Sequence, residues 1–179
     1  GTPGPNNFVL FSLGLKEGYR GALPTLLAIN LGVVSIVILS AVGAGYVAEL
    51  LPSLERYFMW ISFAVLSFIA FRMWPRTSAG PKETKAVIKE QVIGLFFFQF
   101  VNPKIWIIAV GVITTFHAKL SWFLICMATL TVGLCLNSLW TLAGRYLGSF
   151  SAVSGDSVSR FSSILIFLAA IISLYSNMT

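Results

Sequence analysis

Long uncharged runs, separated by short charged gaps, are the main pattern along this chain. A helix needs roughly 20 apolar residues to cross ~30 Å of hydrocarbon. Five runs approach or exceed that length, at residues 21–48, 57–71, 91–118, 120–144 and 161–179. The second run is short, but the arginines on either side of it can extend their charged ends back to the membrane surface. The pattern therefore predicts five membrane-spanning helices.

A sixth uncharged stretch opens the chain. Residues 1–15 contain two prolines, Pro3 and Pro5, and are too short to cross a bilayer as one regular helix. We expect this stretch to be the second half of a first span whose beginning is missing from this sequence. A signal peptide is the competing interpretation, but it would need basic residues before an apolar core. The predicted fold is an all-α integral membrane protein with six transmembrane helices, the first of them incomplete in this chain.

Composition supports the membrane assignment and excludes other classes of protein. Of the 179 residues, 57% are apolar and 10% are charged, against about 45–50% and about 25% in soluble domains. This balance argues against a soluble enzyme, a disordered chain or a nucleic-acid-binding module. The net charge of +6 comes from residues scattered between the apolar runs, not from one basic face. Two cysteines make neither a disulfide framework nor a metal site, so no metal or other cofactor is expected.

The distribution of Lys and Arg predicts the orientation in the membrane. Of the twelve basic residues, nine lie in the gaps after the first, third and fifth spans, two lie in the opposite gaps, and Lys104 lies inside a span. Because basic residues concentrate on the cytoplasmic side, the gap around residues 75–90 is expected in the cytoplasm and both chain ends outside. The chain then divides into a first three-helix repeat at residues 1–74, a basic linker at 75–90 and a second three-helix repeat at 91–179.

Three spans in each half imply that the second repeat is inserted upside down relative to the first. Both leading spans contain proline beside asparagine, as Pro5-Asn6 and as Asn102-Pro103. At 1.5 Å per residue, the two prolines lie about 17 Å and about 20 Å from the expected cytoplasmic surface, near the middle of the membrane. Proline breaks a helix but suits the first position of a new one. The sequence thus predicts a 3+3 inverted repeat with proline-broken helices 1 and 4. The alternative is that each proline makes a simple kink in the helix without a ligand-binding site.

Lys104 is the only charged residue deep inside a predicted span. A charge at this depth is costly, and it is by default functional and turned toward the bundle interior. A helix N-terminus adds unpaired N–H groups and a partial positive charge, which also favour an anion. Together these features predict a site for a carboxylate. Two alternatives stay open: a lysine that is neutral or shuttles a proton, and a structural lysine bonded to the carbonyl groups that Pro103 releases.

Side-chain amides supply the other strong polar groups at membrane depth. Each amide offers both a donor and an acceptor without a net charge, so their carbonyl groups could hold the ammonium of a zwitterion. Asn137 belongs to a small and polar stripe with Thr129, Gly133 and Thr141, of which Thr129 and Gly133 suit helix packing. Asn30 is equally suited to packing and to ligand contact. No catalytic residue is predicted; the candidate substrate-binding residues are Pro5, Asn6, Asn7, Asn30, Gln99, Asn102, Pro103, Lys104 and Asn137.

Two motifs carry a resemblance to a known family. The Pro-Gly-Pro of residues 3–5, followed by a glycine-rich loop, and the Asn-Pro-Lys of residues 102–104 are similar to those of the LysE/RhtB family of bacterial amino-acid exporters. The resemblance covers essentially the whole chain. Within the family, residues 2–7, 99–102 and 137–145 are most similar to the cysteine/O-acetylserine exporters. The resemblance implies efflux of small amino acids from the cytoplasm across the bacterial inner membrane, driven by the proton gradient.

Two other functions compete with transport. A membrane thiol–disulfide electron carrier would need two cysteines that can meet, but Cys126 and Cys135 are nine residues apart and face opposite sides of one predicted helix. Scattered polar residues that serve helix packing would fit a non-transporting membrane subunit. Paired helix breaks in the middle of the membrane would not. The expected partners are an amino-acid substrate, the proton and the lipid bilayer, with no nucleic acid. The sequence leaves the oligomeric state open.

Overall fold

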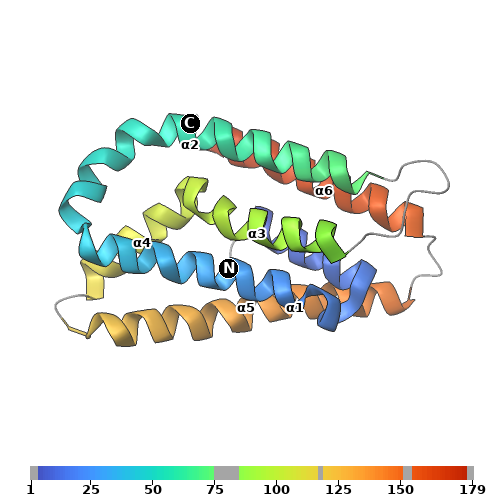
Figure 1. Ribbon diagram of the computed structural model, residues 1–179, viewed down its shortest axis with the longest axis horizontal. Coiled ribbons are helices and arrows are strands. Elements are labelled where there is room, and N and C mark those ends of the chain that lie inside the picture. The colour runs from blue at the N-terminus through green and yellow to red at the C-terminus, as the bar shows by residue number, and fades with distance from the viewer. Residues whose placement is uncertain (1–3, 75–84, 117–118, 151–154, 177–179) are drawn as a thin grey trace.

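The structure is a computed structural model that describes residues 4–74, 85–116, 119–150 and 155–176. Every element in these ranges is an α-helix, as predicted (Figure 1). In chain order the helices are α1 (Pro5–Val42), α2 (Ala44–Met73), α3 (Lys85–Val101), α4 (Pro103–Phe116), α5 (Trp122–Phe150) and α6 (Gly155–Ser176).

Helix α1 consists of two helices joined at Gly18. This residue has φ 71° and ψ −178° inside an otherwise helical stretch. Glycine suits the position because a Cβ atom makes positive φ costly. The chain reverses here, so that the two parts of α1 run in opposite directions along the bundle (Figure 1). The turn lies between residues 15 and 21, where the sequence predicts the first gap between spans.

The two parts of α1, α2, the bent α3–α4 pair, α5 and α6 alternate in direction along the long axis of the bundle (Figure 1). The Gly18 turn, the end of α2 and the start of α3 lie at one end, together with the end of α5 and the start of α6. The same end carries the exposed basic residues Lys16, Arg20, Arg145 and Arg160. The arrangement of the helices therefore gathers the basic gaps of the sequence on one side.

The structure corrects the boundaries of two predicted spans, one of which ends earlier than predicted and one of which starts earlier. The second part of α1 ends at Val42, not at residue 48, because Gly43 closes the helix with a 3.0 Å hydrogen bond from its N–H to the Leu39 carbonyl oxygen. Helix α3 starts at Lys85, so the last residues of the predicted linker 75–90 are helical. The remaining linker, residues 75–84, lies outside the described residues. Charged residues indicate where a helix leaves the lipid, but they do not end the helix.

Helix length and composition support fewer membrane spans than the six predicted. Among the described residues, Pro5–Val42 and Trp122–Ser149 are long and apolar enough to cross a membrane. The bent pair Gln91–Val101 and Pro103–Phe116 makes a third candidate if it is one broken span. The Arg56–Phe71 stretch of α2 is apolar but shorter. The described part of the chain thus contains two or three candidate spans, and the break predicted in the second half is present.

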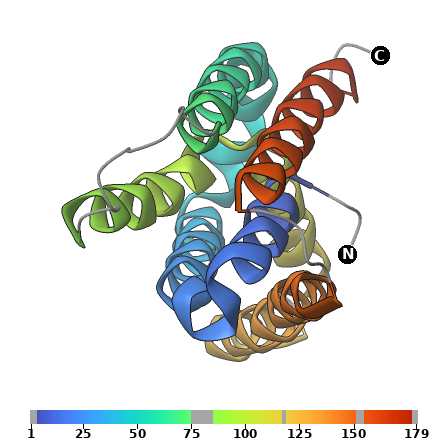
Figure 2. The same ribbon diagram turned by 90° about the vertical axis from the view of Figure 1, so that its right-hand side faces the viewer.

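The first part of α1 lies in the middle of the bundle (Figure 2). Leu10 from this part belongs to a buried cluster with Leu26 from the second part, Leu66 from α2, Leu95 from α3 and Ile166 from α6. Each of these leucine and isoleucine side chains is at most 2% exposed. The cluster holds the beginning of α1 against four neighbouring segments, which fixes the place of the Pro5-Asn6-Asn7 motif.

Helix α5 covers the remaining side of this first part of α1 at very short range. A Cβ atom added at Gly144 would overlap the carbonyl oxygen of Phe11, and one added at Gly14 would overlap the carbonyl oxygen of Thr141. Gly148 lies against Leu15 one turn further on. Glycine at these three positions lets the two helix backbones approach each other. The Gly144–Gly148 pair lies at the end of the fifth predicted span and is part of this contact.

Candidate substrate pocket

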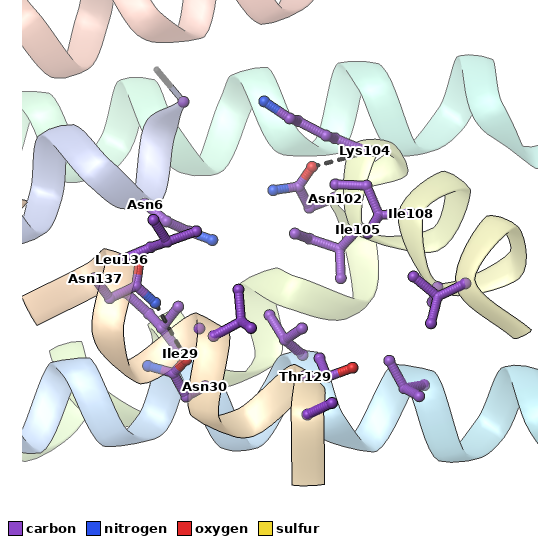
Figure 3. Close-up of a pocket in the computed structure, with 18 of the residues that line it drawn as sticks. Asn6, Ile29, Asn30, Asn102, Lys104, Ile105, Ile108, Thr129, Leu136 and Asn137 are labelled. Carbon is purple, nitrogen blue, oxygen red and sulfur yellow. Dashed lines mark hydrogen bonds between the residues drawn. The ribbon is translucent and has the colours of Figure 1, made fainter. Parts of the chain in front are cut away.

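A pocket of about 640 Å³ lies between both parts of α1, α4 and α5. Its polar wall contains two asparagines at the start of α1, Asn30 from the second part of α1, Asn102 and Lys104 at the start of α4, and Asn137 from α5 (Figure 3). Most of the other lining residues are apolar, among them Ile105, Ile108, Val112, Val132 and Leu136. This volume is in the range of small-molecule sites, which are typically about 300–1,000 Å³.

The break between α3 and α4 shapes one wall of the pocket. The two helices are bent by 60° at this break. Two carbonyl groups released by the break find protein donors: Trp106 Nε1 donates to the Phe100 oxygen at 2.8 Å, and Ser62 Oγ donates to the Val101 oxygen at 2.6 Å. A break at membrane depth persists only where protein or water satisfies the freed backbone. Because Trp106 and Ser62 donate hydrogen bonds to these two carbonyl oxygens, neither oxygen requires a hydrogen bond from Lys104.

The start of α4 has used its own N–H donors. Pro103 has none, the Lys104 N–H donates to Asn102 Oδ1 at 3.2 Å, and the Ile105 N–H donates to the Asn102 carbonyl oxygen at 3.1 Å. Asn102 is thus the N-cap of α4, an arrangement that asparagine favours. The expectation that both helix starts offer free N–H groups is therefore corrected for α4. The partial positive charge of the helix end remains directed at the pocket.

The start of α1 is organised differently. Gly4 is the N-cap residue, Pro5 follows it at the first helical position, and among the described residues no side-chain hydrogen bond caps this end. The N–H groups of Asn7 and Phe8 both donate to the Gly4 carbonyl oxygen, at 3.0 Å and 3.2 Å. Within the described residues, this turn does not pair the Asn6 N–H at the second helical position. Of the two broken helices, α1 is the one whose end suits an anion through its backbone.

Asn6 and Gln99 tie the two helix starts together. Asn6 Nδ2 donates to Gln99 Oε1 at 2.7 Å, and Gln99 Nε2 donates back to Asn6 Oδ1 at 3.1 Å. Gln99 Nε2 also donates to the Leu95 carbonyl oxygen at 2.8 Å. The Gln99 side chain is 0% exposed and does not line the pocket. Its position indicates that Gln99 orients the Asn6 side chain from outside the pocket.

A second amide pair joins α1 to α5. Asn137 Nδ2 donates to Asn30 Oδ1 at 3.3 Å, and Asn30 Nδ2 donates to the Leu26 carbonyl oxygen at 2.7 Å (Figure 3). Gly133 makes room for the Asn30 side chain, because a Cβ atom there would overlap Asn30 Oδ1. Asn30 therefore bridges the helices and also lines the pocket, while its contact with a ligand stays a prediction.

Lys104 lies one residue beyond the start of α4 and lines the same pocket. In the view of Figure 3 its side chain extends past Asn102 toward the side where α1 begins. The side chain is partly exposed. A cationic group, the uncapped start of α1 and several amides thus surround one cavity, which is the chemistry that a carboxylate needs.

Of the nine predicted site residues, the structure brings seven to the pocket wall: Pro5, Asn6, Asn7, Asn30, Asn102, Lys104 and Asn137. Gln99 and Pro103 are buried and do not line it. The stripe on α5 predicts packing for Thr129 and Gly133 and does not single out Trp140, yet all three line the pocket. Gly133 and Trp140 lie four and three residues from Asn137, and Thr129 lies four residues before Gly133, so helical spacing is the signal that could have placed them there.

Replacing Gln99 with leucine is expected to destabilise the protein by about 1–3 kcal/mol, because the half-buried Asn6 amide loses both of its hydrogen bonds to the buried Gln99 side chain. For a chain of this size that lowers Tm by about 2–4 °C per kcal/mol, measured by thermal unfolding in detergent. Phe97→Leu is the control, since Phe97 is two residues away and 60% exposed. Equal Tm values for the two variants would show that the Asn6–Gln99 pair contributes nothing.

Comparisons with known proteins identify the family of this chain. The model of the family described as LysE type translocator matches residues 2–175. The chain is 26% identical over 152 residues to the cysteine/O-acetylserine efflux protein of Salmonella typhi, covering 80% of this chain and 75% of that protein. It is 28% identical over 150 residues, with the same coverage, to the cysteine/O-acetylserine efflux protein of Escherichia coli (strain K12). No solved structure matches the chain. The chain therefore belongs to the LysE type translocator family and is a membrane transporter, not an enzyme.

Proposed function

We propose that this protein exports small amino acids from the cytoplasm across the bacterial inner membrane and that the proton gradient drives the export. The observation that carries the proposal is the meeting of Lys104, the uncapped start of α1 and the asparagine amides around one pocket. Cysteine and O-acetylserine, named for relatives that are 26–28% identical, are the first substrates to test.

In this proposal the substrate carboxylate lies between the Lys104 ammonium and the start of α1. Both groups are positive, and a pocket with few polar atoms strengthens their attraction for an anion. The substrate ammonium is left for amide oxygens, among them Asn6 Oδ1 from the start of α1 and Asn137 Oδ1 from α5. Amide oxygens accept hydrogen bonds from an ammonium without a competing negative charge.

We further propose that the chain spans the membrane six times as a 3+3 inverted repeat. The two parts of α1, α2, the α3–α4 pair, α5 and α6 are the six segments, and they alternate in direction (Figure 1). The start of α4 and the first part of α1 are the two half-helices of this repeat. The end of the bundle with Lys16, Arg20 and Arg145 lies in the cytoplasm, and both chain ends lie outside.

This topology predicts the side from which introduced cysteines react. In a background without Cys126 and Cys135, single cysteines in residues 77–85 should be labelled by an impermeant thiol reagent only after the cytoplasmic side is exposed. Cysteines in residues 49–52 should be labelled from outside in intact cells. The nine-to-two distribution of basic residues motivates this expectation. The opposite labelling pattern would reverse the proposed orientation.

Recognition of the carboxylate is tested by competition in proteoliposomes that carry out counterflow of a labelled amino acid. An analogue that lacks the carboxylate, the corresponding amine, leaves donors unpaired at a cost of roughly 1–3 kcal/mol each. It should therefore compete at least about tenfold less well than the parent amino acid. The deaminated acid should lose less, because amide oxygens can pair among themselves. Stronger competition by the amine than by the acid would point to a cation site.

The electron-carrier alternative finds no support in the cysteines. Both are free and lie on α5, where Cys126 is buried and Cys135 is exposed. Nine residues of helix place them on opposite sides and about 13 Å apart along the axis. A family match as a translocator favours transport over this alternative and over a non-transporting subunit.

A further inference from the structure

The pocket is much longer than its polar wall. On α4 its lining residues are Lys104, Ile105, Ile108, Ala109, Val112 and Phe116, which is one face along almost the whole helix. At 1.5 Å per residue this face is about 18 Å long, and the polar groups occupy only its first turn. The pocket therefore continues well beyond the site proposed for the carboxylate and the ammonium.

The other two walls show the same gradient from polar to apolar. The second part of α1 contributes Asn30 beside the polar wall, and then Val33 and Val37. Helix α5 runs in the opposite direction and contributes Asn137, and then Leu136, Val132 and Ala128 at helical spacing. Thr129 is the one hydroxyl among these α5 positions beyond the amides. We name the apolar section formed by Val33, Ile105, Ile108, Val132 and Leu136 the apolar arm.

The apolar arm begins directly beside the groups that would hold the substrate backbone. Ile105 follows Lys104 in the chain, and Leu136 precedes Asn137. These two polar residues therefore each have a residue of the apolar arm next to them in the sequence (Figure 3). A substrate held by its carboxylate and ammonium at the polar wall would direct its side chain into this section. A short or polar side chain would leave the apolar walls unfilled or would place its own polar atoms against them.

We infer that the preferred substrates are α-amino acids with an unbranched or branched apolar side chain of about four carbons, longer than that of cysteine and less polar than that of O-acetylserine. This inference rests on the proposed function and narrows its substrate class. Identities of 26–28% leave room for the pocket walls to differ from those of the cysteine/O-acetylserine efflux proteins. Burial of each additional methylene in such a section should improve binding about fourfold.

The test is a competition series in counterflow proteoliposomes with the full chain. The competitors are alanine, cysteine, norleucine and O-acetylserine, of which the last two have similar length but different polarity. Norleucine should compete at least about tenfold better than alanine and better than O-acetylserine. Counterflow of cysteine or O-acetylserine that equals or exceeds that of norleucine would overturn the apolar arm while keeping the proposed export of amino acids. Absence of counterflow with every amino acid would instead remove the proposed function itself.

Two neighbouring isoleucines on α4 make a matched pair of variants. Ile108 lines the pocket and is 49% exposed, whereas Ile107 does not line it and is 50% exposed. Ile108→Trp should fill the apolar arm and abolish the preference for norleucine over alanine. Ile107→Trp should keep the preference of the original protein. If Ile108→Trp weakened competition by all substrates equally, the inference would be contradicted. The apolar arm would then be a region filled by lipid or by packing. The competition series does not depend on either variant, so it decides the question even if Ile108→Trp fails to fold.

Discussion

Lys104→Ala is expected to abolish amino-acid transport while the protein is still made and inserted. The substitution removes the cationic side chain from the pocket wall. A substrate carboxylate would then enter a largely apolar pocket without its charged partner, and loss of one member of such a pair costs about 3–5 kcal/mol. That corresponds to a loss of roughly two to four orders of magnitude in affinity. Counterflow at saturating and at low substrate concentration would measure the loss.

The conservative and control variants sharpen this prediction. Lys104→Arg should keep at most part of the activity, because the guanidinium is larger and presents a rigid fork in place of a compact charge. Lys119 is exposed and lies outside the pocket, so Lys119→Ala should transport normally. A normal rate for Lys104→Ala would show that the substrate carboxylate is held elsewhere.

Gly144→Ala is expected to lower the stability of the protein strongly for the addition of one methyl group. The new Cβ atom would overlap the carbonyl oxygen of Phe11, which is backbone and has no rotamer into which it can withdraw. Overpacking of this kind typically costs about 1–3 kcal/mol, or a Tm lower by about 2–4 °C for each kcal/mol. Gly14→Ala should behave similarly, because its Cβ would overlap the carbonyl oxygen of Thr141 in the same contact.

Gly94→Ala and Gly111→Ala are the matched controls for these glycine variants. A Cβ atom at either position meets nothing within 4 Å. Alanine is the better helix former by about 1 kcal/mol, so these two variants should be neutral or slightly more stable. Thermal unfolding in detergent separates the two groups. If all four variants had the same Tm, the close approach of α1 and α5 would have no part in stability.

The sequence predicts much of this architecture because charged residues mark the gaps between spans and proline breaks a helix at its own position. Gly18 and the break at Asn102-Pro103 lie where gaps and motifs indicate them. The ends of helices were predicted less well, because Lys85 and the residues after it extend α3 through a stretch that charge alone assigns to a linker.

Tertiary partners could not be derived from the motifs. Nothing near Gln99 in the sequence indicates that its amide faces Asn6, 93 residues away, in place of the pocket. The same holds for Ser62, which binds a carbonyl oxygen 39 residues further along the chain. Asn102 shows the limit of a motif. The proline of Asn102-Pro103 predicts a helix break, but only the geometry shows that the Asn102 side chain accepts the Lys104 N–H that was expected to bind substrate.

The glycine contacts between α1 and α5 have a consequence for how the pocket could open. Two backbones that touch at Gly14 and Gly144 cannot slide or tilt against each other without collision. The first part of α1 and the facing half of α5 must therefore move as one body during any change of access. Gly18, where an added Cβ would meet nothing within 4 Å, offers a pivot at one end of that body. Alternating exposure of the site then depends on the motion of α4 and the second part of α1 relative to this unit.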